Sequence, residues 1–336
     1  MSSLKVLLIA FIILINVFQS VEASSQCFEL KYGINLAGPE FASKKQPGKL
    51  GHDYQFPTGV HLLYYKAKGF NSVRLPILWE RLQSELYSDL DTAYLNEIQV
   101  FLKKAEQHEL DVVLDLHNYG RYKGEIVGSQ DIPNQAFYDV WKKIAQSLQS
   151  YPALLAYGLM NEPHDTKGLW FSVAQSGVDG IRSVDKDKNI YIAGEHWSNA
   201  HVWSRVNPKP FVVDPQNKIA YEAHIYFDKN FSGTYKNHGE IYKKEDVYRR
   251  LKSFVLWLKK YNLKGVIGEW GVPSDNPAWF PVVDEFTDLA KEHCLDWYYW
   301  RGGVWADKYH LSLEPIKAKD KPLMQFLSQK IKDHQN

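Results

Sequence analysis

The chain has 336 residues, with 40 Lys and Arg against 39 Asp and Glu, so its formal net charge is +1. The two signs are mixed along the chain without a basic stripe, which argues against nucleic acid as a partner. There are two cysteines and no Cys/His cluster with metal-ligand spacing, so we expect no metal and no other cofactor. The 48 aromatic residues (11 Trp, 21 Tyr and 16 Phe) fit either a large core or stacking surfaces for sugar rings.

The first 23 residues are typical of a secretory signal peptide. Lys5 precedes an almost purely apolar stretch, 6–18, and small residues flank Glu22. This stretch is too short to span a bilayer comfortably, so cleavage after Ala23 is favoured over an uncleaved anchor. We expect a secreted protein without a membrane partner, a monomer whose residues 24–336 form one domain.

Beyond this segment, short apolar runs alternate with amphipathic stretches, a pattern typical of parallel α/β proteins. Eight runs are expected to be strands: 32–36, 72–76, 111–117, 155–161, 189–193, 219–226, 265–269 and 296–300. Helices are predicted over ranges that include 91–108, 134–149, 245–261 and 277–293, with Asp91, Asn134 and Asn276 as N-caps. The Pro-rich crossover 199–217 is expected to be a loop.

Eight strands with crossovers predict a single-domain (β/α)₈ TIM barrel. A doubly wound open sheet is the alternative, but no G-x-G-x-x-G motif follows the first strand. Closing the barrel would make its first and last strands neighbours. Cys27 and Cys294, which precede these two strands, would then meet at the bottom rim, so we predict that they form a disulfide.

In such a barrel the active site lies at the carboxyl ends of the strands. Polar and aromatic residues gather at those expected ends: Arg74, His117, Asn118, Asn161, Glu162, Glu195, His196, His224, Tyr226, Glu269 and Trp300. Each could be structural on its own, as a core histidine or a buried ion pair. Together, two carboxylates on one rim predict glycoside hydrolysis, in which one carboxyl protonates the leaving oxygen and the other attacks the anomeric carbon. Arg74 would keep the attacking carboxylate ionised.

The motifs around these residues resemble glycoside hydrolase family 5, and within it the secreted endo-β-1,4-glucanases. The resemblance covers nearly all of the chain after residue 23. It is carried by the segments 33–41, 73–76, 114–119, 159–164, 224–228 with 232–234, 267–271 and 299–305. Seven such segments in the family's order are highly specific, although each alone is weak.

The resemblance implies a role for each matching residue. Glu162 would be the acid/base and Glu269 the nucleophile, which Arg74 and Tyr226 would hold in place. Asn161 would contact the sugar 2-OH. Trp300 would be the aromatic platform under the sugar, and the residues that would line the cleft are His117, Asn118 and His224.

The implied function is a retaining endo-β-1,4-glucanase that acts on cellulose-like or mixed-linkage glucans. The same fold and mechanism acting on β-mannan, xyloglucan or β-1,3-glucan is one alternative, and a catalytically inactive carbohydrate-binding barrel is another. Glu195, His196 and Arg301 depart from the family pattern near the rim, which would affect sugar subsites. The tripeptide that begins at Asn230 is a glycosylation acceptor pattern, meaningful only in a eukaryotic host.

Overall fold

The computed structural model describes residues 27, 29–236 and 243–335. The predicted signal peptide, residues 1–23, lies outside the described residues, so its cleavage after Ala23 stays a prediction. Within the described part of the chain, no helix is both long and apolar enough to cross a membrane.

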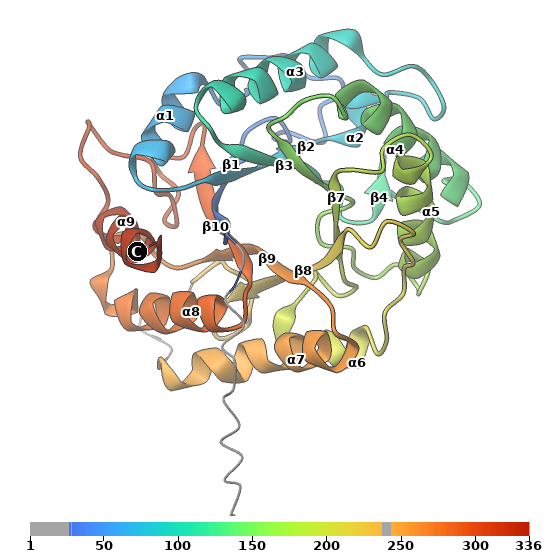
Figure 1. Ribbon diagram of the computed structural model, residues 1–336. Coiled ribbons are helices and arrows are strands. Elements are labelled where there is room, and N and C mark those ends of the chain that lie inside the picture. Colours follow the sequence, from blue (N-terminus) through green and yellow to red (C-terminus); the bar gives the residue numbers. More distant parts are fainter. Residues whose placement is uncertain (1–26, 28, 237–242, 336) are drawn as a thin grey trace, which may run out of the picture.

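Eight parallel strands close into a barrel in the order β1-β10-β9-β8-β7-β6-β3-β2 (Figure 1). They are β1 (Tyr32–Ala37), β2 (Ser72–Ile77), β3 (Asp111–Leu116), β6 (Leu154–Gly158), β7 (Asn189–Ala193), β8 (Ile219–Tyr226), β9 (Gly265–Gly271) and β10 (Asp296–Gly303). Each predicted strand has its counterpart here, and the predicted TIM barrel is confirmed. A small hairpin of β4 (Arg121–Tyr122) and β5 (Glu125–Ile126) follows β3.

Helices surround the ring of strands (Figure 1). They are α1 (Gly59–Ala67), α2 (Trp79–Leu82), α3 (Thr92–Gln107), α4 (Asn134–Leu148), α5 (Trp170–Arg182), α6 (Trp203–Val206), α7 (Glu245–Tyr261), α8 (Phe280–Glu292) and α9 (Pro322–Gln335), with the 3₁₀ turns η1 (Ala200–Val202) and η2 (Pro277–Trp279). Asp91 caps α3 by accepting a hydrogen bond from the Tyr94 amide, and Asn276 caps η2, as predicted.

Two local predictions are wrong. Pro133, not Asn134, is the N-cap of α4, because the Pro133 carbonyl accepts from the Ala136 amide and Asn134 is already helical. The crossover 199–217 is not all loop, since it contains η1 and α6. The buried Trp203 explains this exception: its ring packs edge-on against Phe254 of α7, with 4.7 Å between centroids, and holds this one helical turn against the barrel.

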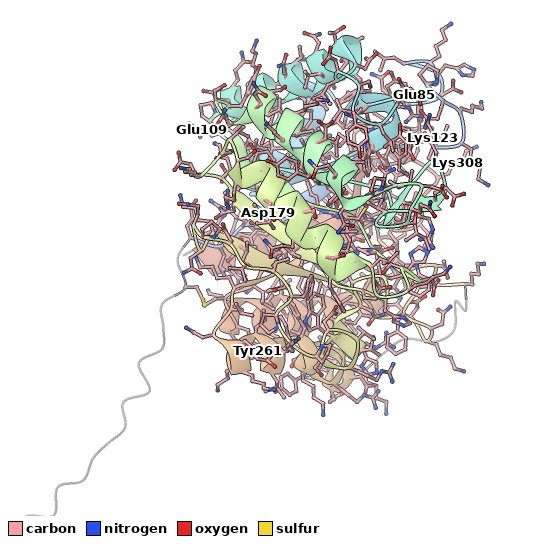
Figure 2. All side chains as sticks on the ribbon, turned by 90° about the vertical axis from the view of Figure 1, so that its right-hand side faces the viewer. Glu85, Glu109, Lys123, Asp179, Tyr261 and Lys308 are labelled. Carbon is pink, nitrogen blue, oxygen red and sulfur yellow. A yellow bond between two sulfur atoms is a disulfide. The ribbon has the colours of Figure 1, made fainter. Side chains whose placement is uncertain are left out.

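The two ends of the barrel differ in chemistry. In the side view, Lys123 and Lys308, which follow β3 and β10, lie at one end, and Glu109, just before β3, lies at the other (Figure 2). A small buried cluster inside the barrel includes Tyr191 and Tyr298. Gly33 makes room for it, because a Cβ there would lie 2.1 Å from the Tyr298 ring. Charged side chains occupy the interior at the carboxyl ends of the strands.

Cys27 and Cys294 form a disulfide with 5.3 Å between their Cα atoms, which confirms the predicted pairing. Cys294 lies between α8 and β10, and Cys27 precedes β1, the strand that pairs with β10. The bond therefore joins the segments that lead into the first and the last strand of the barrel. It lies at the amino ends of these strands, opposite the face where the charged residues gather.

Replacing both cysteines with serine should lower the melting temperature and leave activity at lower temperature intact. The bond closes a loop of 267 residues, for which chain-entropy arguments give about 4–5 kcal/mol at most, and measured losses are often smaller. Differential scanning calorimetry with and without reductant measures the effect. A reductant should lower the melting temperature of the parent protein but not that of the double serine variant. An equal melting temperature of the parent with and without reductant would contradict the prediction.

Candidate active site

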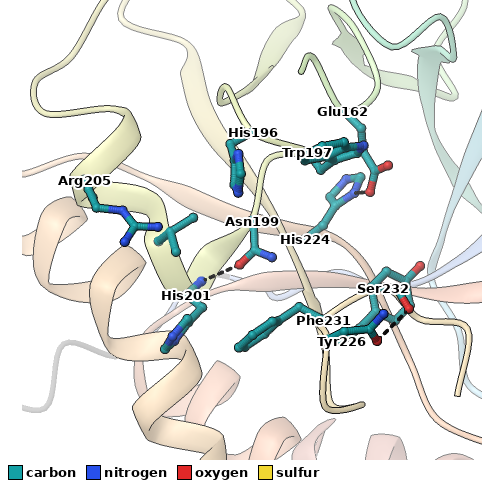
Figure 3. A pocket seen from close by; sticks show the side chains of 12 residues that line it. Glu162, His196, Trp197, Asn199, His201, Arg205, His224, Tyr226, Phe231 and Ser232 are labelled. Carbon is teal, nitrogen blue, oxygen red and sulfur yellow. Dashed lines mark hydrogen bonds and ion pairs between the residues drawn. The ribbon is translucent and has the colours of Figure 1, made fainter. Parts of the chain in front are cut away.

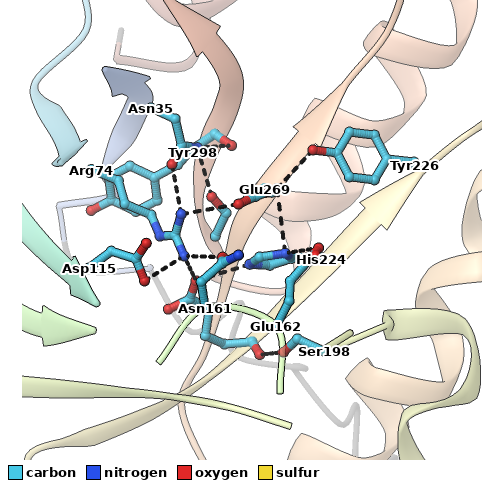
Figure 4. A network of polar contacts seen from close by, with 12 residues as sticks. Asn35, Arg74, Asp115, Asn161, Glu162, Ser198, His224, Tyr226, Glu269 and Tyr298 are labelled. Carbon is cyan, nitrogen blue, oxygen red and sulfur yellow. Dashed lines mark hydrogen bonds and ion pairs between the residues drawn. The ribbon is translucent and has the colours of Figure 1, made fainter. Parts of the chain in front are cut away.

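Most of the predicted site residues come together at the carboxyl ends of the barrel strands, and Figure 4 shows the polar network around Arg74 and His224. Arg74 lies on β2, and His224 and Tyr226 on β8. Glu269 lies on β9 and Trp300 on β10. Asn161 and Glu162 lie three and four residues after the end of the short strand β6, and His117 directly follows β3. Six strands of the barrel thus carry or precede the residues of one polar cluster, as expected for a barrel of this type.

Arg74 is the centre of this cluster and is fully buried. Its Nη1 donates to Asn35 Oδ1 (2.9 Å) and to Glu269 Oε1 (3.2 Å). Its Nη2 donates to Asn161 Oδ1 (2.9 Å) and forms ion pairs with Asp115 (2.9 Å) and Glu222 (3.0 Å). Burial alone would lower the pKa of this guanidinium, but the surrounding carboxylates raise it above its ordinary value.

Glu269 is held on two sides. Arg74 contacts Oε1, and the Tyr226 hydroxyl donates to Oε2 at 2.9 Å. Burial raises the pKa of Glu269 above its ordinary value, and the charge of Glu162 adds to this, whereas His224 and Arg74 lower it. Arg74 therefore favours the ionised form of Glu269, which is the expected direction. Its lowering effect on the pKa of Glu269 is outweighed by the effect of burial.

Glu162 is the more exposed of the two acids, with 18% of its side chain accessible against 5% for Glu269. Its backbone has φ of 43°, in the left-handed region that a residue with a Cβ rarely adopts. Strain of this kind gathers at functional sites. One carboxyl oxygen of Glu162 and one of Glu269 lie within 4.8 Å of each other, so a single small group can contact both.

His224 connects the two acids. Its Nδ1 lies 2.8 Å from Glu162 Oε1 and 3.6 Å from Glu269 Oε2, and its Nε2 lies 3.1 Å from Glu222 Oε1. Burial lowers the pKa of His224, but the Glu269 charge and the hydrogen bonds to Glu162 and Glu222 overcome this and raise it to about 10. Both ring nitrogens therefore carry protons at neutral pH.

Glu162, His224 and Glu269 also have the composition of a metal site, because their ligand atoms are mutually within 4.8 Å. A metal-bound histidine needs a ring nitrogen without a proton. Both ring nitrogens of His224 face carboxylate oxygens, and a metal would have to displace a proton held at a raised pKa, so the arrangement favours an ion-pair network.

His117 and Trp300 form a second wall. Their rings stack with centroids 5.5 Å apart and planes at 9°. His117 Nδ1 lies 2.7 Å from Asp115, and its Nε2 lies 3.1 Å from the Tyr119 hydroxyl and 3.3 Å from Asn161 Nδ2. Although burial lowers the pKa of His117, the hydrogen bond and charge of Asp115 raise it overall.

Two pockets meet at Glu162. The first is about 390 Å³, and its lining includes His117, Tyr119, Glu269 and Trp300. The second is about 560 Å³; its lining includes Trp197 but not Glu269 (Figure 3). Glu162 lines both, so the acidic pair sits within one continuous cleft.

The family profile described as Cellulase (glycosyl hydrolase family 5) matches residues 34–304, most of the chain. The chain belongs to glycosyl hydrolase family 5. Endo-beta-1,4-glucanase B of Emericella nidulans is 31% identical over 290 residues, which cover 84% of this chain and 86% of that protein.

Among solved structures, the Pseudomonas stutzeri endoglucanase Cel5A in complex with cellobiose is 39% identical to this chain. It superimposes with a TM-score of 0.87 over 90% of this chain and 92% of that one. The endo-beta-1,4-glucanase Xac0029 of Xanthomonas axonopodis pv. citri is 32% identical, with a TM-score of 0.85 over 91% of this chain and all of that one.

Some residues predicted for the rim of this family 5 hydrolase are used elsewhere. The Asn118 amide accepts from the Trp79 backbone (2.8 Å) and donates to Glu80 (2.7 Å), so it braces the start of α2 and does not line either pocket. Glu195 is likewise occupied, because its carboxylate accepts from the amide and the hydroxyl of Thr166. His196, by contrast, lines the second pocket.

Arg301 does not project into the cleft either. Its guanidinium lies between two rings, 4.9 Å from the centroid of Phe41 and 5.0 Å from that of Tyr309. Burial lowers the pKa of Arg301. Beside it, the ring of Trp305 stacks on Phe41 with 6.0 Å between centroids, so this group extends the aromatic surface near the platform residue Trp300.

The prediction from sequence missed the acids beneath the histidines. Asp115 lies two residues before His117, and Glu222 two residues before His224. Because side chains alternate along a strand, an acid two positions earlier points to the same face as its histidine, and this spacing is the signal that could have revealed both. Gly268 makes room for Glu222, since a Cβ there would lie 1.9 Å from Glu222 Oε1.

The contact between Glu222 and His224 predicts a specific pH effect. Glu222→Gln replaces a carboxylate whose hydrogen bond raises the pKa of His224 with a neutral amide, so this pKa should fall from about 10 toward neutrality. Activity that needs the His224 proton is then lost at lower pH, and the alkaline limb of kcat/KM should move down by about one pH unit or more.

Glu195→Gln is the matched control, because Glu195 is also an acid near the rim but binds Thr166 instead of His224. It should leave the alkaline limb in place. An unmoved limb in folded Glu222→Gln would show that Glu222 does not set the charge of His224.

Proposed function

We propose that this family 5 hydrolase is an endo-β-1,4-glucanase that cleaves with net retention of configuration. The observation that carries the proposal is the spacing of the two acids, whose nearest ligand oxygens are within 4.8 Å. Retaining glycosidases have carboxyl groups about 5–5.5 Å apart, whereas inverting enzymes need roughly 6.5–9.5 Å to admit a water molecule. The short spacing supports direct attack by a carboxylate.

In the first step Glu269 attacks the anomeric carbon, and the bond from that carbon to the leaving oxygen breaks. Arg74 and Tyr226 fix the nucleophile through separate oxygens, which orients it for attack. Glu162 gives a proton to the leaving oxygen, and the carboxylate that results is stabilised by the hydrogen bond from His224 Nδ1. The product is a glycosyl ester on Glu269 and a shortened leaving chain.

In the second step a water molecule attacks the same carbon and releases Glu269. Glu162 takes the proton from this water and returns to its starting state. Asn161, positioned by Arg74, is proposed to bind the sugar 2-OH, a contact that strengthens in the transition state. The buried ion pairs keep these groups fixed, so little reorganisation accompanies the developing charge.

The cleft supports a chain-like substrate bound across the acids. On the nucleophile side, Trp300 offers a partly exposed ring for the apolar face of a pyranose. On the other side, Trp197 is 40% exposed and its ring stacks on His164 with 4.4 Å between centroids. Binding surfaces on both sides of the scissile bond favour cleavage within a chain, and the names of the glucanase relatives support glucan as the substrate.

We also propose that the enzyme is secreted after cleavage at Ala23, acts as a monomer on polysaccharide, and needs no cofactor. The disulfide between Cys27 and Cys294 supports an oxidising destination. Asn230, the acceptor in the glycosylation pattern, is exposed and lines the second pocket.

A substrate panel tests the activity. Carboxymethylcellulose should lose viscosity well before reducing ends accumulate, and barley glucan should also be cleaved, because an endo-acting enzyme cuts in the middle of chains. Viscometry and reducing-sugar assays in parallel provide the measurement. Faster hydrolysis of mannan or xyloglucan than of any β-1,4-glucan would contradict the assignment of glucan as the substrate. If no polymer is hydrolysed, the protein is an inactive carbohydrate-binding barrel.

The roles of the two acids are tested by azide rescue. Glu162→Ala should cost about 10²–10⁴ in rate on natural substrate, yet an activated aryl glycoside should still react and yield a β-glycosyl azide. In Glu269→Ala, azide occupies the nucleophile's place and yields an α-glycosyl azide. NMR distinguishes the products, and Glu195→Ala is the control for loss of a nearby acid. A 2-fluoro glycoside should label Glu269, and labelling of Glu162 would reverse the assignment.

A further inference from the structure

The second pocket, which we call the leaving-group pocket, differs in charge from the rest of the cleft. Glu162 protonates the leaving oxygen, so the chain released in the first step lies on this side. The pocket is lined by Glu162, His196, Trp197, Asn199, His201, Val202, Arg205, His224, Tyr226, Asn230, Phe231 and Ser232. Glu162 is the one acid among these, and it is already engaged by His224.

Arg205 provides a positive charge at the far end of this pocket. In Figure 3 it lies at the end opposite Glu162, near His201. Across residues 27, 29–236 and 243–335, the Arg205 guanidinium has no ion pair or side-chain hydrogen bond. The other arginines near the cleft differ, since Arg74 and Arg301 are each enclosed by protein groups. Arg205 is therefore a cation placed on the substrate path and open to a ligand.

The wall beside Arg205 consists of aromatic rings, and a second guanidinium lies against one of them. The His201 ring stacks on Phe231 with 4.8 Å between centroids, and the Arg250 guanidinium lies 4.2 Å from the Phe231 centroid. Burial lowers the pKa of His201, and the positive charges of Arg250, Arg249 and Arg205 lower it further. The chain as a whole is nearly neutral, yet the segment 199–264 has a marked excess of Lys and Arg over Asp and Glu.

We propose that the leaving-group pocket binds a carboxylate on the reducing-end side of the glucan, with Arg205 as its partner. The ligand class is a cello-oligosaccharide that ends in an aldonic acid, in which the reducing-end carbon is oxidised to a carboxylate. Such a chain would bind with its neutral sugars at the catalytic acids and along Trp197, and with its charged end toward Arg205. This inference rests on the proposed function, because it uses the direction in which Glu162 and Glu269 place the substrate.

The test compares cellopentaose with cellopentaonic acid, its aldonic acid, at low ionic strength. The ratio of kcat/KM for the acid to that for the neutral sugar is measured within each variant, so a general change in activity cancels. The parent enzyme should favour the acid about two- to fivefold, as expected for one solvent-exposed ion pair. The preference should disappear at high salt, because exposed charges are screened.

Arg205→Gln should bring the ratio close to one, Arg205→Lys should keep part of the preference, and Arg205→Glu should invert it. Lys252→Gln is the matched control: it also removes one positive charge, but Lys252 lines a separate pocket formed by α7 and the segment that contains Ser204 and Pro208. It should retain the parent ratio. A second control substrate has its carboxylate at the non-reducing end, where Arg205 should have no effect.

The outcomes separate the two proposals. If cellopentaose itself is not hydrolysed, the proposed glucanase function fails. If cellopentaose is cleaved but Arg205→Gln keeps the parent ratio, the carboxylate site is wrong. Equal effects of Arg205→Gln and Lys252→Gln would show a long-range influence of net charge and would also overturn the site.

Discussion

The buried guanidinium of Arg74 is the interaction on which the rest of the site depends. An isolated charge inside a barrel would be strongly destabilising, so it must be surrounded by partners. Those partners come from β1, β3, β8 and β9 and from the residue that precedes the acid/base: Asn35, Asp115, Glu222, Glu269 and Asn161. The need to satisfy one cation thereby draws together side chains from several strands around the barrel and positions Glu269, the proposed nucleophile, as a consequence.

His224 extends this network from the nucleophile to the acid/base. It contacts Glu222 on one side and Glu162 and Glu269 on the other, so a single imidazolium is shared by three carboxylates. Two acids this close would repel each other strongly if both were ionised. A cation between them reduces that repulsion and lets the pair stay within the short spacing that a retaining mechanism requires.

Different loops build the two sides of the cleft. The nucleophile side is formed by aromatic residues around β10, with Trp300 against His117 and Trp305 against Phe41. The leaving-group side is formed by the segments after β7 and β8, where Trp197 is joined by histidines and Arg205. Loops can change without disturbing the barrel, so the chemistry of the acids and the recognition of the two ends of the substrate are structurally separable.

The sequence by itself determined the barrel, the disulfide partners and the rim position of Glu162 and Glu269, the two proposed catalytic acids. These features follow from local signals: apolar runs that alternate with amphipathic stretches, and polar residues at the ends of the runs. Tertiary structure alone decided which rim side chains face the cleft. Asn118 and Glu195 lie at the predicted rim but bind the start of α2 and Thr166, whereas Arg205, within a crossover predicted as loop, lines the cleft. The physical reason is that a polar side chain takes the partner nearest in space, and distances across a closed barrel are set by contacts between segments far apart in the chain.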